Sequence, residues 1–120
     1  LKAADGHSFP AYVAKPAGKA KGGVVVLQEI FGVNAHIRAV ADGYAAAGYF
    51  VVAPATFSRI GKGDVQLGYT ESDMKEGFGY KGAVEALPAP GVMADIQAAV
   101  DHAAQAGKVG IVGYCWGGLL

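Results

Sequence analysis

Apolar residues gather in short runs that predict strands. Residues 24–28, 49–53 and 108–113 are rich in valine and isoleucine and show no polar alternation, which predicts three strands buried on both faces. Residues 7–15 alternate weakly, and Pro10 removes a backbone donor within them, so an edge strand is predicted there. The sequence therefore predicts a sheet with a buried centre and one edge strand near the start of the chain.

Apolar positions spaced by three and four residues predict two helices. The first is capped by Asn34 and ended by Gly48, and the second covers residues 92–103 and is ended by Gly107. Residues 58–81 contain five glycines and mixed charges without a clean period, so a loop with at most a short helix is predicted there.

The order of these elements indicates the fold class. Strand, helix, strand, long excursion, helix and strand follow one another, which is the βαβ alternation of an α/β protein with a mostly parallel sheet and flanking helices. Functional residues of such sheets gather where the strands end. Residues 28–34, 54–59 and 113–118 hold those positions here.

Composition narrows the classes of function. Ten Lys and Arg balance ten Asp and Glu, so no basic excess favours nucleic acid or an anionic membrane as a partner. The single cysteine allows no internal disulfide, and neither a membrane-spanning stretch nor a secretory signal is visible. No His, Cys or carboxylate pair has metal-ligand spacing, so neither a metal nor a cofactor is expected. The expectation is a soluble, cytoplasmic protein.

The two ends of the chain suggest a partial domain. The chain starts at Leu1 without methionine, and it stops at Leu120 with two glycines and two leucines that resemble the opening of a buried helix. Domain termini are usually polar and loosely held. Residues 1–120 are therefore expected to form a single incomplete domain, the front part of a longer protein.

The turn Gly-Tyr-Cys-Trp-Gly-Gly, residues 113–118, follows the third predicted strand directly. It has the small–x–nucleophile–x–small form of a nucleophile elbow, in which Gly113 and Gly117 remove collisions around a strained residue. A helix start after the turn would favour the thiolate of Cys115, and the Trp116 amide would receive an oxyanion. The alternative is that Cys115 is a small buried residue between close-packing glycines. A dinucleotide-binding loop is excluded because G-x-G-x-x-G is not met.

The loop Gln-Glu-Ile-Phe-Gly-Val-Asn, residues 28–34, leaves the first buried strand at the same edge of the sheet. A second oxyanion donor normally comes from this position, and the amide of Ile30 is the candidate. The Glu29 carboxylate is expected to accept the proton of a nearby thiol. Its alternative role is that of a solvent-facing residue at a strand end or a helix cap.

Three segments resemble the dienelactone hydrolase family of the α/β-hydrolase fold: Q-E-I-F-G-V-N-A-H-I-R (28–38), G-Y-F-V-V-A-P (48–54) and G-K-V-G-I-V-G-Y-C-W-G-G (107–118). The resemblance implies that Cys115 is the nucleophile of a Cys-His-Asp triad and that Glu29 contacts the cysteine and helps to activate it. It also implies that Ile30 and Trp116 form the oxyanion hole through their backbone amides.

Two features depart from the family pattern. The family's Asp and His follow the elbow and would lie beyond Leu120, so the triad is incomplete in residues 1–120. The name-giving members hold a substrate carboxylate with arginines, whereas no arginine follows Arg59 here. His7, His36 and His102 are not expected to act as the base. A broader lactone or carboxylic ester is the expected small-molecule substrate.

Two rival hypotheses remain open. The chain can be a catalytically inert fragment or pseudo-enzyme that acts as an assembly module, self-associating through an exposed sheet edge or apolar face. Alternatively, Cys115 can be a redox-sensing thiol, although the chain offers it no resolving cysteine.

Overall fold

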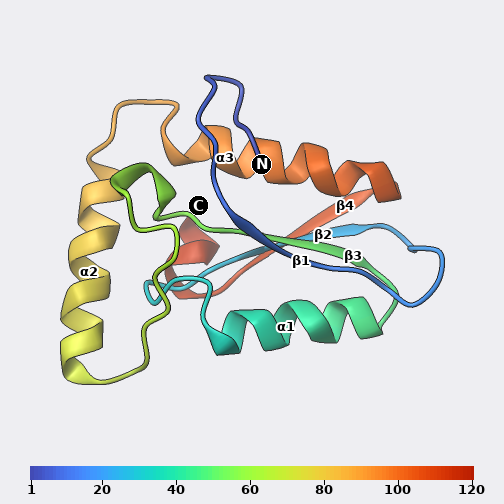
Figure 1. Cartoon of the computed structure of the whole chain (residues 1–120), viewed down its shortest axis with the longest axis horizontal. Coiled ribbons are helices and arrows are strands. Elements are labelled where there is room, and N and C mark those ends of the chain that lie inside the picture. The colour runs from blue at the N-terminus through green and yellow to red at the C-terminus, as the bar shows by residue number, and fades with distance from the viewer.

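The computed structural model describes residues 1–120 as one four-stranded sheet with helices on both faces (Figure 1). The strands lie in the order β1-β3-β2-β4; β1 pairs antiparallel with β3, whereas β2 runs parallel to both β3 and β4. The strands are β1 (Ala11–Ala14), β2 (Gly23–Leu27), β3 (Phe50–Pro54) and β4 (Val109–Gly113). The α-helices are α1 (Ala35–Ala46), α2 (Glu71–Glu85) and α3 (Val92–Ala103), and the 3₁₀ turns are η1 (Ser58–Ile60), η2 (Ala104–Ala106) and η3 (Cys115–Leu119). Each of these helices is too short or too polar to serve as a membrane-spanning segment.

The centre of the sheet is buried on both faces, as the apolar runs predict. Every residue of β2 and β3 is buried. Side chains alternate along these strands: Val25 and Val52 pack in the cluster that contains α3, and Val26 and Val51 pack in the cluster that contains α1. Two apolar layers therefore hold the middle strands in place, with α3 on one side and α1 on the other (Figure 1).

The cap predicted for α1 is confirmed. Asn34 has an extended backbone, and its side-chain oxygen accepts a hydrogen bond from the Ile37 N–H at 3.2 Å. The helix then buries Ile37, Ala41 and Ala45 against the sheet. The predicted edge strand also forms, as β1, and the second predicted helix forms as α3.

The prediction of a loop with at most a short helix over residues 58–81 is wrong, because α2 begins within them and is 15 residues long. Thr70 caps this helix by accepting a hydrogen bond from the Asp73 N–H at 3.1 Å. Only Gly77 and Val84 are buried along this helix. The sequence of α2 therefore lacks the regular spacing of apolar residues that would have predicted a helix. Its cap and tertiary contacts, rather than amphipathicity, favour the helix.

The prediction that the third apolar run is buried on both faces is also wrong. The run forms β4, but Ile111 is 55% exposed, and both β4 glycines and Val109 are incompletely covered. The strand pairs with β2 along one edge only, so it has a neighbour on one side. Burial of a strand depends on what packs against it, which a short apolar run does not encode.

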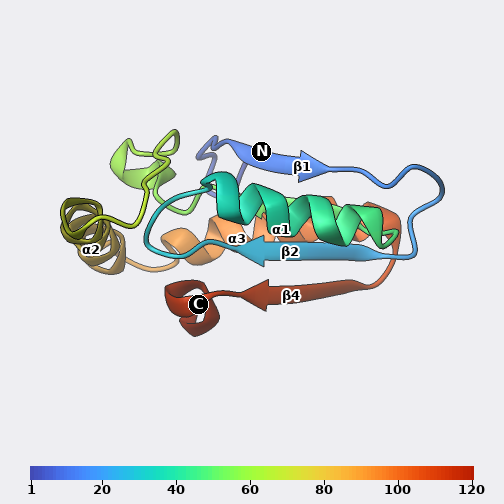
Figure 2. The same ribbon diagram turned by 90° about the horizontal axis from the view of Figure 1, so that it is seen from below.

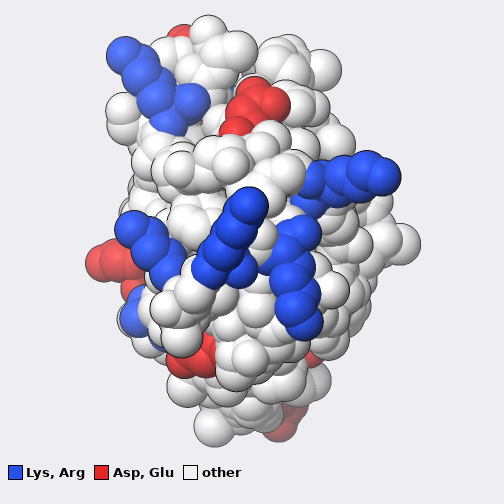
Figure 3. Space-filling view, turned by 90° about the vertical axis from the view of Figure 1, so that its right-hand side faces the viewer, with Lys and Arg blue, Asp and Glu red and all other residues white.

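Positive side chains are concentrated at the end of the sheet where β2, β3 and β4 begin (Figure 3). The loop between β1 and β2 supplies Lys15, Lys19 and Lys21, and Lys108 precedes β4. These strands end on the opposite side of the molecule, so the lysines lie far from the carboxyl ends of the strands.

One ion cluster clamps the first residues of the chain to η1 and α3. The Arg59 guanidinium lies 2.7 Å from Asp5 and 2.9 Å from Asp95, whose side chain is fully buried. Arg59, followed by the His7 backbone N–H, lowers the pKa of Asp5 from 3.8 to about 2. The Asp5 carboxylate therefore stabilises the fold in its ionised form.

We expect this contribution to vanish in acid. Because the pKa of Asp5 is lower in the folded than in the unfolded state, its stabilisation is present above about pH 4 and is lost as the pH falls towards 2. Urea unfolding should show Asp5→Asn to be less stable than the wild type near neutral pH and indistinguishable from it near pH 2. A difference that is independent of pH would contradict the clamp.

Candidate active site

The carboxyl ends of β2, β3 and β4 meet at one end of the sheet. β2 and β4 run in the same direction, and β4 ends beside η3 on the side of the molecule where α2 lies (Figure 2). The segments that follow the strands are residues 28–34, residues 55–57 and residues 114–118, the last of which includes most of η3. Residues separated by more than eighty positions in the sequence are thereby brought to one edge, as expected for a parallel sheet.

Cys115 occupies a strained turn directly after β4. Its φ is +53°, and it is the one non-glycine residue of the chain with a positive φ. Such a conformation costs about 1–3 kcal/mol and persists only where its surroundings enforce it. The turn is held on both sides, by the Tyr114 N–H donating to the Leu27 carbonyl at 3.3 Å and the Gly117 N–H donating to the Tyr114 carbonyl at 2.9 Å. The thiol itself is exposed.

The two glycines that flank the turn have no room for side chains. A Cβ atom added at Gly113 would overlap the Gly117 carbonyl and lie 2.6 Å from the Gly118 nitrogen. A Cβ added at Gly117 would lie 2.5 Å from the Leu27 oxygen and 2.6 Å from the Gln28 oxygen. The backbone of the turn therefore lies directly against the end of β2.

Ile30 and Trp116 anchor their side chains in the same apolar cluster. Ile30 is 4% exposed and Trp116 is 2% exposed. The Trp116 ring stacks on Phe57, with ring centroids 5.4 Å apart and an interplanar angle of 23°. Both backbones are consequently held next to the sheet end by buried side chains.

Gln28 links the ends of β2 and β3, a role that the sequence analysis did not assign. Its side chain is fully buried; Nε2 donates to the Glu29 carbonyl and Oε1 accepts from the Thr56 N–H, both at 3.0 Å. The sequence does contain a sign of this role. Gln28 directly follows a valine-rich strand that is predicted to be buried, and a buried amide side chain needs hydrogen-bond partners.

Glu29 follows Gln28 and is half-buried. Its Oε1 atom is shielded from water and accepts no hydrogen bond, and the hydroxyl of the nearby Thr56 is also unpartnered. A buried polar atom without a partner costs about 1–3 kcal/mol, and more when it is charged. Such atoms are uncommon in stable folds and require an explanation.

The three histidines have other surroundings. His7 Nε2 lies 3.1 Å from Ser58 Oγ, the His102 ring lies 5.6 Å from the Phe50 ring, and the exposed His36 lies edge-on to Tyr114 at 6.1 Å. Tyr114, the residue before Cys115, packs against the cluster that contains α1. Burial, followed by the Tyr44 hydroxyl, raises the pKa of Tyr114, so its phenol stays neutral.

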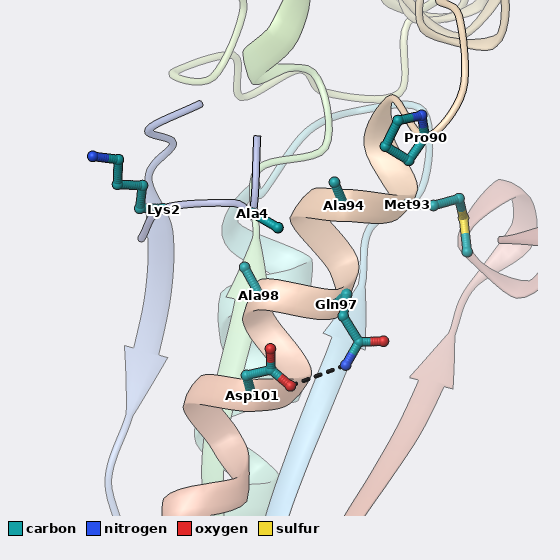
Figure 4. Close-up of a pocket in the computed structure, with 8 residues that line it drawn as sticks. All are labelled: Lys2, Ala4, Pro90, Met93, Ala94, Gln97, Ala98 and Asp101. Carbon is teal, nitrogen blue, oxygen red and sulfur yellow. Dashed lines mark hydrogen bonds between the residues drawn. The ribbon is translucent and has the colours of Figure 1, made fainter. Parts of the chain in front are cut away.

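The largest surface hollow lies away from these residues. It has a volume of about 470 Å³ and lies between the first residues of the chain and α3 (Figure 4). Small side chains form much of its lining, and Gln97 donates a hydrogen bond to Asp101 at 2.9 Å. Its lining contains no Cys, Ser, Thr or His. No group of three or more His, Cys, Asp or Glu able to hold a metal ion occurs in the chain.

Three comparisons identify the relatives of this chain. The model of the dienelactone hydrolase family matches residues 9–120. A carboxymethylenebutenolidase of Pseudomonas putida is 34% identical over 100% of this chain and 51% of its own length. A Methylorubrum extorquens protein named "putative carboxymethylenebutenolidase" is 40% identical over 92% of this chain and 38% of its own length.

The fold agrees with this assignment. A crystal structure of a "putative dienelactone hydrolase" from Klebsiella pneumoniae matches 97% of this chain and 49% of that protein, with a TM-score of 0.71 and 33% identity. The chain spans about half the length, or less, of these relatives. The chain belongs to the dienelactone hydrolase family, and its sheet and helices form part of the α/β-hydrolase fold.

Proposed function

We propose that this chain supplies the nucleophile and the oxyanion hole of a cysteine hydrolase that acts on a lactone or carboxylic ester. The observation that carries the proposal is the positive φ of Cys115, which holds an exposed thiol on a turn between two glycines that cannot bear side chains. Strain at a nucleophile is typical of catalytic turns. The proposed reaction needs water but no metal or cofactor. A cysteine with no disulfide partner within residues 1–120 agrees with a cytoplasmic location, which is proposed as well.

The proposed reaction proceeds through a thioester. The Cys115 thiolate attacks the carbonyl carbon, and the N–H groups of Ile30 and Trp116 stabilise the negative oxygen of the tetrahedral intermediate. The C–O bond then breaks, the alcohol oxygen takes a proton, and water hydrolyses the thioester. The histidine that transfers protons and the aspartate that orients it are proposed to follow Leu120.

Glu29 is proposed to accept the proton of the Cys115 thiol. The support is that Oε1 is buried without a partner, in a loop whose neighbouring carbonyls lie against the turn of the cysteine. A carboxylate oxygen without a hydrogen-bond partner keeps its lone pairs available to accept a proton.

The arrangement of Arg59 supports an uncharged ester or lactone as the substrate. Its guanidinium donates two hydrogen bonds to Asp5 and two to Asp95, at 2.7–3.0 Å. Two carboxylates thus neutralise the one guanidinium that lies just beyond β3. The Arg59 guanidinium is therefore not available to bind a carboxylate of the substrate.

An assembly module is the second candidate function. The features that favour it are the unpaired edge of β4, with Ile111 55% exposed, and Leu119, which is 81% exposed. If this role is the correct one, size exclusion will show a defined oligomer, and iodoacetamide will react with Cys115 no faster than with a free thiol.

The roles of Cys115 and Glu29 are tested by alkylation and by acylation with an activated ester. Cys115→Ala should abolish both reactions, and Glu29→Gln should slow alkylation near neutral pH by about tenfold or more, because the thiol loses its proton acceptor. Glu71→Gln, at an exposed position on α2, is the matched control and should react as the wild type. Equal rates for Glu29→Gln and wild type would remove Glu29 from the mechanism.

The geometry of the turn is tested by adding one methyl group. Gly117→Ala should destabilise the fold by about 3 kcal/mol, because the new Cβ overlaps the carbonyls that end β2. Gly110→Ala, on β4 with nothing within 4 Å of the new atom, is the control and should cost much less. Chemical denaturation measures both values, and equal costs would mean that the turn does not lie against β2.

We propose that the active site is divided between residues 1–120, which supply Cys115 and the oxyanion hole, and a downstream segment, which supplies the Asp and His. Complementation tests this division. Residues 1–120 alone should not turn over an ester, and activity should appear when the segment with the downstream Asp and His is added, in the same chain or as a separate polypeptide. If residues 1–120 alone hydrolyse an ester through Cys115 at the rate of the whole protein, the proposed division is wrong.

A further inference from the structure

We propose that the arm formed by residues 65–85, which includes α2, positions both amides of the oxyanion hole, with Gly77 acting on Ile30 and Tyr80 acting on Trp116 through Phe57. The inference rests on the proposed function, because it takes these two amides to be the oxyanion donors. None of the arm residues needs to touch the substrate, so Gly77 and Tyr80 are positioning residues.

The first part of the arm is joined to the oxyanion loop along its backbone. The Leu67 N–H donates to the Phe31 carbonyl at 2.8 Å, and Gln66 forms an antiparallel bridge with Gly32. Asn34 Nδ2 donates to the Leu67 carbonyl at 3.0 Å. The arm therefore holds the loop immediately after Ile30 as a short additional strand would.

Close approach at Gly32 makes this connection rigid. Gly32 has a φ of +81°, which favours glycine, and a Cβ atom there would overlap the Val65 carbonyl. Asn34 adds a second constraint, since its side-chain oxygen caps α1 while its nitrogen donates to the arm. The loop is thus fixed between the arm and α1.

The helix of the arm then contacts Ile30 itself. Gly77 is buried, and a Cβ atom at this position would overlap the Ile30 carbonyl oxygen and lie 3.2 Å from Ile30 Cγ1. The carbonyl and the N–H of Ile30 flank the same Cα atom, so a shift of one reorients the other. Glycine at position 77 allows α2 to press on the loop without displacing it.

The same helix reaches the other amide through two aromatic contacts. Tyr80 lies edge-on to Phe57, with ring centroids 5.5 Å apart, and Phe57 stacks on Trp116 at 5.4 Å. Phe57 is 1% exposed and Trp116 is 2% exposed, so these two stacked rings are shielded from water. One helix therefore constrains both residues whose N–H groups are proposed to bind the oxyanion.

A positioning role and a general structural role predict different chemistry at Cys115. Acylation by an ester passes through an oxyanion and depends on where the two amides lie. Alkylation by iodoacetamide displaces iodide from carbon and forms no oxyanion, so it reports only the thiolate. A residue that positions the amides should change the first rate and not the second.

The test is Gly77→Ala in the intact enzyme, with p-nitrophenyl acetate and iodoacetamide as the probes. Because the new Cβ displaces the loop, acylation should fall by about 10- to 100-fold at unchanged alkylation rate. Gly79→Ala, two residues along the same helix with nothing within 4 Å, is the matched control and should acylate as the wild type. Both variants gain the same helix propensity.

Tyr80 provides a second measurement in case Gly77→Ala does not fold. Tyr80→Leu should slow acylation alone, and Tyr80→Phe should keep the wild-type rate because it retains the ring against Phe57. Wild-type acylation in both Gly77→Ala and Tyr80→Leu overturns the inference, as does an equal loss of alkylation. Acylation that survives in Cys115→Ala would instead overturn the proposed function, so the two failures are distinguishable.

Discussion

The candidate site depends on a contact between two backbones, where the turn after β4 lies against the carbonyls that end β2. No side chain fits between them, because a Cβ at Gly117 would lie 2.5 Å from the Leu27 oxygen. The ladder between β2 and β4 sets this register, and the Tyr114 N–H extends it by one bond to Leu27. The strained cysteine and the loop with Glu29 and Ile30 are neighbours for this reason.

The site contains costly features that the rest of the fold offsets. Cys115 has a positive φ, and Glu29 Oε1 and the Thr56 hydroxyl are buried without partners. These costs are concentrated at one end of a sheet whose central strands are completely buried between α1 and α3. Gln28 adds rigidity there by bonding to residues after both β2 and β3. A rigid sheet with its strain confined to the loops is the usual arrangement of a preorganised site.

The segment between β3 and α3, which includes η1 and α2, contributes contacts to the fold rather than reactive groups. It contains Arg59, which two aspartates neutralise, and α2, which presses on Ile30 through a glycine. Neither feature adds a reactive group. The contact of Gly77 holds the loop that contains Ile30, whereas the lysines around the starts of β2, β3 and β4 lie at the opposite end of the sheet (Figure 3).

The sequence by itself determined the features that local patterns encode. These are the apolar central strands, the Asn34 cap, the helical period of α1 and α3, and the glycine spacing around Cys115. The tertiary structure decided the rest. α2 has only two buried residues and almost no apolar period, and the exposure of β4 depends on which elements pack beside it. The links from Gln28 to Thr56 and from Gly77 to Ile30 join distant segments, and no local pattern specifies which partners meet.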